Sequence, residues 1–181
     1  MSPHIDRLKP RDKKTGLINV IIETPAGSRS KFRYDEDTRL FQLDKLLPLG
    51  AAFPYDFGFV PGTLAEDGDP LDLILIGAEA TFAGCHVTAR LLGVIEAKQT
   101  EAGKTIRNDR LIGTAETERI HPPERSISDL PKHVLDDLER FFVSYNQAEG
   151  RSFVPLARRG PATASKLVDE SARSHGKHRS R

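Results

Sequence analysis

The stretch FVPGTLAEDGDPLDLILIG, residues 59–77, joins a cluster of carboxylates to an apolar strand. Its three aspartates, Asp67, Asp69 and Asp72, lie within six residues and lead directly into Leu-Ile-Leu-Ile. Like charges ~4 Å apart repel by ~1–4 kcal/mol at dielectrics from water to a protein surface. Such a cluster needs either water around a splayed loop or a cation between the carboxylates. Hard oxygen ligands suit Mg²⁺, with Mn²⁺ also possible, and both explanations are open at this point.

Short strand patterns flank this stretch on both sides. Each is rich in β-branched or alternating apolar residues, and glycine-containing turns separate them. Several short strands with turns between them predict a small barrel or a strongly curled sheet. The expected strands cover residues 18–23, 31–34, 40–43, 71–76, 87–97 and 111–115.

Two helices are expected after the strands. Apolar residues recur at helical spacing from Val134 to Tyr145, and Asp129 followed by Pro131 predicts the start of this long helix. A shorter helix is expected over residues 161–172. The fold class is therefore mainly β with helices (α+β), with the helices outside the sheet.

The 181 residues suffice for one domain, expected over residues 17–170. Residues 1–16 read as a loose polar arm, and the basic residues of 171–181 read as a frayed, solvated tail. The formal net charge of +1 gives no reason to expect nucleic acid as a partner. No apolar run approaches the ~20 residues of a membrane helix and no signal peptide is recognisable, so we expect a cytoplasmic protein without a membrane partner.

Several cationic side chains lie on or beside the predicted strands. Lys31 and Arg33 share one strand face, Lys45 follows the next strand, and Arg110 precedes the last one. Any one of them is adequately explained as a strand-edge charge that discourages aggregation. If the barrel gathers them at one rim with the aspartates, they form the arrangement that phosphoryl transfer requires, with cations around a phosphate.

The motif Asp67-Gly68-Asp69-Pro70-Leu71-Asp72 resembles the D-G-D-P-x-D motif of the family I soluble inorganic pyrophosphatases. The preceding segment, residues 53–63, resembles the aromatic approach to that motif, and the likeness follows chain order over residues 17–150. The resemblance implies a five-stranded OB-like barrel, a homo-oligomer, and Mg²⁺-dependent hydrolysis of inorganic diphosphate to two phosphates by a metal-activated water.

The resemblance also implies roles for individual residues. Asp69 and Lys31 would be catalytic, Asp69 by orienting and deprotonating the attacking water. Substrate oxygens would contact Lys31, Arg33, Lys45, Arg110 and Tyr145. The metal ligands would come from Asp67, Asp72, Asp69, Glu23, Asn108 and Asp109, with Glu23 acting through water.

The chain also departs from the family pattern, at positions 33, 45, 53, 57, 108 and 146, occupied by Arg33, Lys45, Phe53, Phe57, Asn108 and Asn146. A metal loop expected over residues 98–110 lacks an obvious second aspartate, with Gln99 or Glu101 nearest. Arg151, Arg158 and Arg159 are either replacement cations or part of a surface strand. These departures keep two alternatives open: a related phosphohydrolase with altered substrate or low diphosphatase activity, and an OB-like nucleic-acid-binding module.

Overall fold

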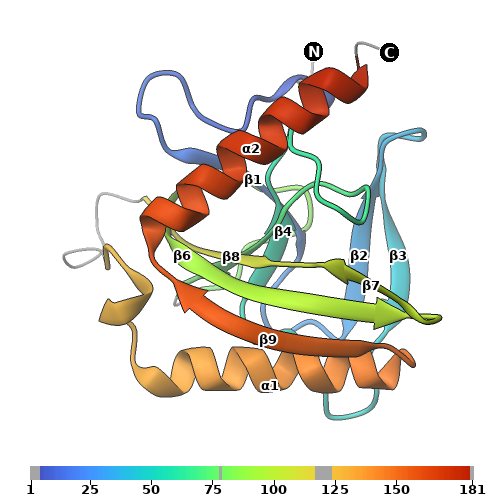
Figure 1. The fold of residues 1–181 in the computed structure, drawn as a ribbon. Coiled ribbons are helices and arrows are strands. Elements are labelled where there is room, and N and C mark those ends of the chain that lie inside the picture. Colours follow the sequence, from blue (N-terminus) through green and yellow to red (C-terminus); the bar gives the residue numbers. More distant parts are fainter. Residues whose placement is uncertain (1–4, 78, 117–123, 180–181) are drawn as a thin grey trace.

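The computed structural model describes residues 5–77, 79–116 and 124–179. It consists of nine strands, two α-helices and two short 3-10 turns (Figure 1). The strands are β1 (Ile18–Thr24), β2 (Ser30–Asp35), β3 (Leu40–Leu46), β4 (Asp56–Phe59), β5 (Asp72–Ile76), β6 (His86–Glu101), β7 (Lys104–Arg107), β8 (Arg110–Ala115) and β9 (Ser152–Arg159). The helical elements are η1 (Ile5–Arg7), η2 (Ile127–Asp129), α1 (Lys132–Ala148) and α2 (Pro161–Arg179).

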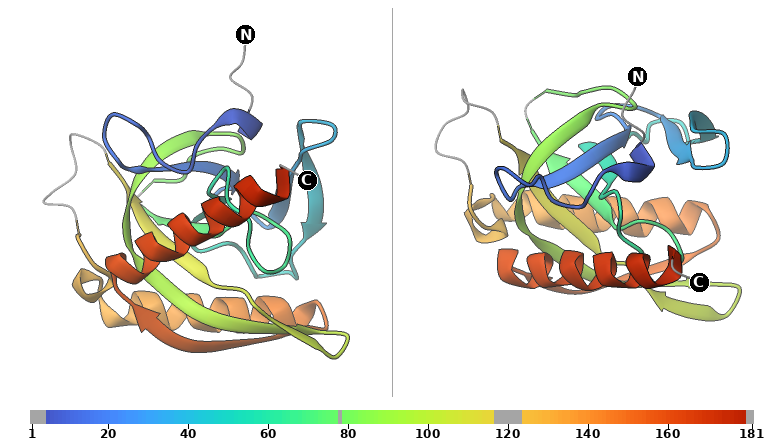
Figure 2. Two further views of the ribbon diagram at one scale, coloured as in Figure 1. Left: turned by 45° about the horizontal axis from the view of Figure 1, so that its top comes forward. Right: turned by 90° about the horizontal axis from the view of Figure 1, so that it is seen from above.

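Five strands close into a ring, which confirms the predicted five-stranded barrel. The order of hydrogen-bonded neighbours is β1, β4, β5, β8 and β6, and β6 returns to β1. All these pairings are antiparallel except β5 with β8. The long strand β6 also pairs with β7 and β9 beyond the ring, while β2 and β3 form a separate hairpin. Figure 2 shows this hairpin standing at one end of the barrel.

Apolar side chains on the two faces of the ring strands enter two different clusters. Ile74 and Ile112 pack toward α1, whereas their neighbours Leu73 and Leu111 pack in the cluster that includes Ala164 of α2. This alternation is the period of two that a strand imposes on its side chains. The two helices therefore cover opposite faces of the strands, as Figure 1 shows, and both faces are buried.

The helices differ from the expectation at their ends. Asp129 caps η2 and not α1, since its carboxylate accepts the N–H groups of Arg125 and Ser126. Pro131 stands at the α1 N-cap without a side-chain cap. Helix α2 continues to Arg179, through most of the segment expected as a frayed tail. Helical hydrogen bonding outweighed the polar composition that favoured a tail.

The N-terminal arm is attached to the barrel over the residues that the structure describes. Arg11 Nη2 lies 2.9 Å from the Asp169 carboxylate of α2. Asn19 donates its side-chain amide to the Lys9 carbonyl and its backbone N–H to the Pro10 carbonyl. The contact of Arg11 with Asp169 links positions 158 residues apart in the sequence, and local composition gives no signal for it.

One glycine of the barrel permits a close approach of two strands. A Cβ at Gly58 in β4 would lie 2.1 Å from the Ile21 carbonyl oxygen of β1. We expect Gly58→Ala to reduce the free energy of unfolding by ~1–3 kcal/mol, because the strands must shift to admit the methyl group. Gly176→Ala in α2 is the control, since a Cβ there meets nothing within 4 Å and alanine favours a helix. Urea unfolding measures both, and an unchanged midpoint for Gly58→Ala would contradict the packing.

Candidate active site

A single large pocket of about 880 Å³ collects most of the predicted site residues. It is lined by the acidic loop (residues 63–72), strands β2 and β3, the β6–β7 hairpin and the C-terminal end of α1. The predicted residues that line it are Glu23, Lys31, Arg33, Lys45, Asp67, Asp69, Asp72, Asn108, Arg110 and Tyr145. Asp109 is the one predicted residue that does not line the pocket.

The acidic loop is shaped by a buried hydroxyl. Thr63 is 1% exposed; its Oγ1 donates to the Val60 carbonyl at 2.6 Å and accepts the Leu71 N–H at 2.9 Å. Within the loop, the Asp69 N–H donates to Asp67 Oδ1 at 3.1 Å. The Leu64 N–H donates to the Ser171 carbonyl, so helix α2 supports the loop from behind. Asp67 and Asp69 are thereby held on an exposed turn at the pocket.

The parallel pairing of β5 with β8 brings a carboxylate and a guanidinium together. Leu73 pairs with Leu111, so the preceding residues Asp72 and Arg110 emerge at the same end of the two strands. Arg110 Nη1 lies 2.6 Å from Asp72 Oδ2, and the Arg110 side chain is only 6% exposed. The guanidinium also lies over the rings of Phe142 and Phe153, with its Cζ 5.1 and 5.4 Å from their centroids. The result is a fixed cation at the pocket wall.

Burial makes it less favourable for the carboxylates of the pocket to carry a negative charge. Burial raises the pKa of Asp67 and of Asp72 above their usual range, and for Asp72 the neighbouring Arg110 acts in the opposite direction. Burial likewise raises the pKa of Glu23 to about 7, against the effects of Lys31 and of the Tyr34 N–H. That N–H donates to Glu23 Oε1 at 2.7 Å. The acidic side of the pocket thus favours an additional cation.

The predicted cations on the β2–β3 hairpin differ in how they are held. Lys31 Nζ lies 5.4 Å from the centroid of the Phe57 ring. Lys45 Nζ is paired with Glu149 at 2.6 Å and lies 5.8 Å from the centroid of the Tyr145 ring. Arg33 is 54% exposed in its side chain and lies 3.8 Å from Asp35. Lys31 also lines the pocket, and within the described residues it has no carboxylate oxygen within 4 Å.

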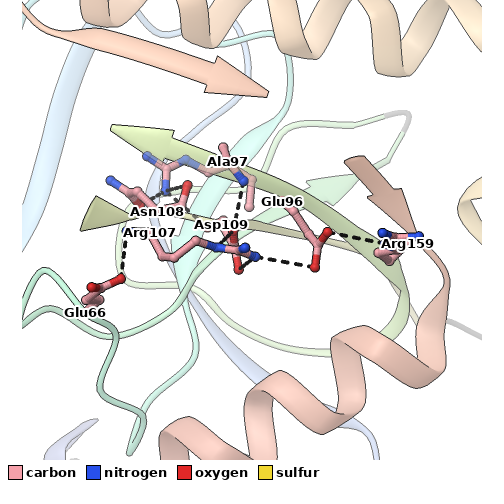
Figure 3. A network of polar contacts seen from close by, with 8 residues as sticks. Glu66, Glu96, Ala97, Arg107, Asn108, Asp109 and Arg159 are labelled. Atoms are coloured by element: carbon pink, nitrogen blue, oxygen red, sulfur yellow. Dashed lines mark hydrogen bonds and ion pairs between the residues drawn. The ribbon is translucent and has the colours of Figure 1, made fainter. Parts of the chain in front are cut away.

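Residues 98–110, expected as a metal loop, form the β6–β7 hairpin and the start of β8. Ala102 and Gly103 make its turn with positive φ angles of 48° and 78°. Asn108 reaches the pocket but donates its amide to Gln99 Oε1 at 2.9 Å. Asp109 instead accepts the Ala97 N–H and the Arg107 guanidinium, so its carboxylate is turned away from the pocket (Figure 3).

Two contacts between walls of the pocket were not predicted from the sequence: Arg107 with Glu66, and Arg151 with Glu101. The Arg107 N–H donates to Glu66 Oε2 at 2.7 Å, which ties the acidic loop to β7 (Figure 3). Arg151 lines the pocket beside Glu101, whereas Arg158 is bound by Asp136 and Glu139 of α1. Sequence alone offers no signal for Glu66, because its partner is a backbone group on a distant strand.

The aromatic departures from the family pattern are accommodated in the core. Phe53 and Phe57 are buried and stack with each other, and Phe53 also contacts the rings of Phe141 and Tyr145. Asn146 is 1% exposed and donates its amide to the Phe142 carbonyl. Burial raises the pKa of the Tyr145 phenol, which therefore stays protonated at neutral pH. These side chains form the pocket floor and fix the end of α1.

The chemistry of the donor set fits a divalent cation at the acidic loop. Asp67, Asp69 and Asp72 offer hard oxygen ligands, and burial raises the pKa of Asp67 and of Asp72. Among residues 5–77, 79–116 and 124–179, no three acid, histidine or cysteine side chains are arranged to hold a metal between them. Mg²⁺ typically takes one or two carboxylates and completes its shell with water and phosphate, so two of these aspartates would suffice to hold it.

Comparison with known proteins decides the family. The sequence profile of the inorganic pyrophosphatases matches residues 20–175. The inorganic pyrophosphatase of Synechocystis is 38% identical over 166 residues, covering 92% of this chain and 96% of the relative. The chain belongs to the inorganic pyrophosphatase family. The predicted family and enzyme class, inorganic diphosphatase, are confirmed, and the comparisons favour an enzyme over a nucleic-acid-binding module.

Solved structures of inorganic pyrophosphatases share the fold of this family member. The Thermus thermophilus protein aligns with a TM-score of 0.86 at 27% identity, covering 96% of this chain and 99% of that chain. The Neisseria gonorrhoeae protein aligns with a TM-score of 0.85 at 30% identity, with the same coverage. A relative 33% identical to this chain is the soluble inorganic pyrophosphatase 2 of Chlamydomonas reinhardtii. In the described part of this chain, no helix has the length and apolarity to span a membrane.

The hydroxyl of Thr63 makes the acidic loop sensitive to a nearly isosteric change. We expect Thr63→Val to reduce the free energy of unfolding by ~1–3 kcal/mol, because the buried Leu71 N–H loses its acceptor and the Val60 carbonyl its donor. Thr63→Ser keeps the hydroxyl and should lose less. Urea denaturation compares the two variants, and a loss for Thr63→Ser as large as that for Thr63→Val would contradict the role given to the hydroxyl.

Proposed function

We propose that this pyrophosphatase hydrolyses inorganic diphosphate in the pocket between the acidic loop and Arg110, with Mg²⁺ as its cofactor and Mn²⁺ as a substitute. One observation carries the proposal: a turn with three carboxylates faces fixed protein cations across one pocket. Carboxylates alone would repel diphosphate, and cations alone would bind phosphate without activating water. Together they support both binding and hydrolysis.

The residues that would hold Mg²⁺ are Asp67, Asp69 and Asp72, with Glu23 acting through water. Asp72 uses Oδ2 in its ion pair with Arg110 and has a second oxygen for a cation. When bound, the ion would neutralise phosphate oxygens and acidify water. Asn108 and Asp109, also predicted as ligands, do not offer carboxylate oxygens to the pocket: Asn108 is an amide and Asp109 is turned toward Arg107.

The protein's own groups supply the remaining steps. Arg110 and Lys31 hold the two phosphate groups, and Tyr145 donates a hydrogen bond from its protonated phenol. Asp69 accepts a proton from the attacking water while the oxygen of that water bonds to one phosphorus. The bond from that phosphorus to the bridging oxygen then breaks, and the second phosphate leaves with its negative charge stabilised by the cations. Arg33 and Lys45 add positive charge at the rim.

The first experiment is phosphate release from diphosphate with Mg²⁺ titrated from zero and Mn²⁺ in parallel. Triphosphate and nucleotides serve as competing substrates. Metal-dependent release with diphosphate preferred supports the proposal. Release from triphosphate or nucleotides in its place would establish the altered substrate that Arg33, Asn108 and Asn146 allow. Folded protein inactive on all of them would overturn the proposal.

Asp69→Asn tests the assigned base. We expect turnover to fall by ~10²-fold or more, because an amide cannot accept the proton of the attacking water. Asp137→Asn is the control, since Asp137 is exposed on α1, lies outside the pocket and pairs with Arg140. Phosphate release at saturating Mg²⁺ measures both variants, with circular dichroism to show that they are folded. Turnover close to wild type would remove Asp69 from this role.

We further propose that the protein is cytoplasmic and a homo-oligomer. Four leucines of β3 and the following loop are exposed, with Leu49 the most at 86%. The others are Leu40, Leu43 and Leu46. Four large exposed apolar side chains on one strand and the loop after it are the basis for proposing a protein interface there. Sedimentation equilibrium at micromolar concentration tests this assembly, and we expect a mass above 20.1 kDa. A mass equal to that of one chain would contradict it.

A further inference from the structure

Two amides and a guanidinium, those of Gln99, Asn108 and Arg110, define the hairpin side of the pocket. The acidic side chain that lines the pocket from this hairpin, Glu101, is paired with Arg151 at 3.1 Å. Gln99 and Asn108 are each 8% exposed, and they bind each other through the Asn108 amide. Asn108 Oδ1 in turn accepts the Arg110 guanidinium. Both amide oxygens are thus occupied by protein donors, and both are neutral. They are poor ligands for a hard divalent cation, which favours carboxylates and water.

Arg110 has a permanent charge and little freedom to move. Asp72 and Asn108 bind its Nη1, and the guanidinium lies against the rings of Phe142 and Phe153. Its Nε is buried and has no hydrogen-bond partner among the described residues. A guanidinium is not deprotonated in proteins, so the cation is present at every working pH. An ion at the acidic loop has the three aspartates of that loop to offset the charge of Arg110, whereas an ion on the hairpin side would meet that charge beside two neutral amides.

We propose that Arg110, held by the Gln99–Asn108 amide pair, takes the place of a divalent cation on the hairpin side of the pocket. Divalent ions load only at the acidic loop, and the hairpin side presents a protein cation directly to a phosphate group. Arg151, on the same side, adds a second guanidinium. The inference rests on the proposed function, because it assumes that the pocket binds diphosphate together with a divalent ion.

The first test counts Mn²⁺ ions bound without substrate, by equilibrium dialysis and electron paramagnetic resonance. Wild type should bind Mn²⁺, and Asp67→Asn with Asp69→Asn should lose most of that affinity, because only Asp72 and Glu23 of the proposed ligands remain. Both aspartates are exposed, so this double variant should fold. The control, D137N with E170Q, removes two exposed carboxylates elsewhere and should bind as wild type does. A loop variant that binds Mn²⁺ as tightly as wild type, or a wild type that binds none, would overturn the proposal.

The second test restores carboxylates on the hairpin side. Gln99→Glu with Asn108→Asp changes two amides to carboxylates of nearly the same shape. This variant should bind one more Mn²⁺ than wild type, and its melting temperature should rise more with Mn²⁺. Thr100→Glu with Thr105→Asp is the matched control, because these neighbours lie on the same hairpin but do not line the pocket. It should keep the wild-type count.

Equal counts for the folded Gln99→Glu, Asn108→Asp variant and wild type would overturn the inference. If the two buried carboxylates prevent folding, the loop variant still decides, since it leaves the hairpin unchanged. Both counts are made without diphosphate, so they do not depend on turnover. An enzyme inactive on diphosphate would overturn the proposed function while leaving the metal count to decide the inference.

Discussion

The ion pair between Arg110 and Asp72 is the contact on which the site depends. It exists because β5 and β8 run parallel with Leu73 beside Leu111, so that both strands begin at the same end of the barrel. Removing one partner of a largely buried pair leaves an uncompensated charge and is strongly destabilising, whereas the intact pair adds little net stability. Its significance is thus geometric. It sets a permanent cation at one wall of the pocket and holds an aspartate at the mouth of the buried strand.

The repulsion among the aspartates is relieved from several directions. Asp67 accepts the Asp69 N–H, Asp72 binds Arg110, and Lys31 attracts both Asp72 and Glu23. Burial still raises the pKa of Asp67 and of Asp72, so these carboxylates carry their charge at a cost in free energy. In the proposed function, a divalent cation that arrives with diphosphate stabilises the charged carboxylates.

The substitutions relative to the family pattern fall into two physical groups. Phe53, Phe57 and Asn146 are buried and satisfied by packing or by a backbone carbonyl, so they alter the pocket floor without leaving a buried polar group unpaired. Gln99 and Asn108 act together, because each supplies the hydrogen bond that the other needs. Arg158, whose pKa is raised by Glu139 and Asp136, joins β9 to α1 and is structural.

The sequence by itself determined the family, the strand-rich fold, the acidic loop and the ten predicted site residues that line the pocket. These features depend on local patterns: a contiguous motif, alternation along strands and a helical stripe. Only the tertiary structure decided that Asp109 turns away, that Glu66 binds β7, and that α2 extends to Arg179 while supporting the acidic loop. The reason is that strand register and long-range hydrogen bonds set these positions. Asn108 and Asp109 lie in the connection between β7 and β8, where Asn108 binds Gln99 while Asp109 binds Ala97 and Arg107, so they separate although the sequence places them together.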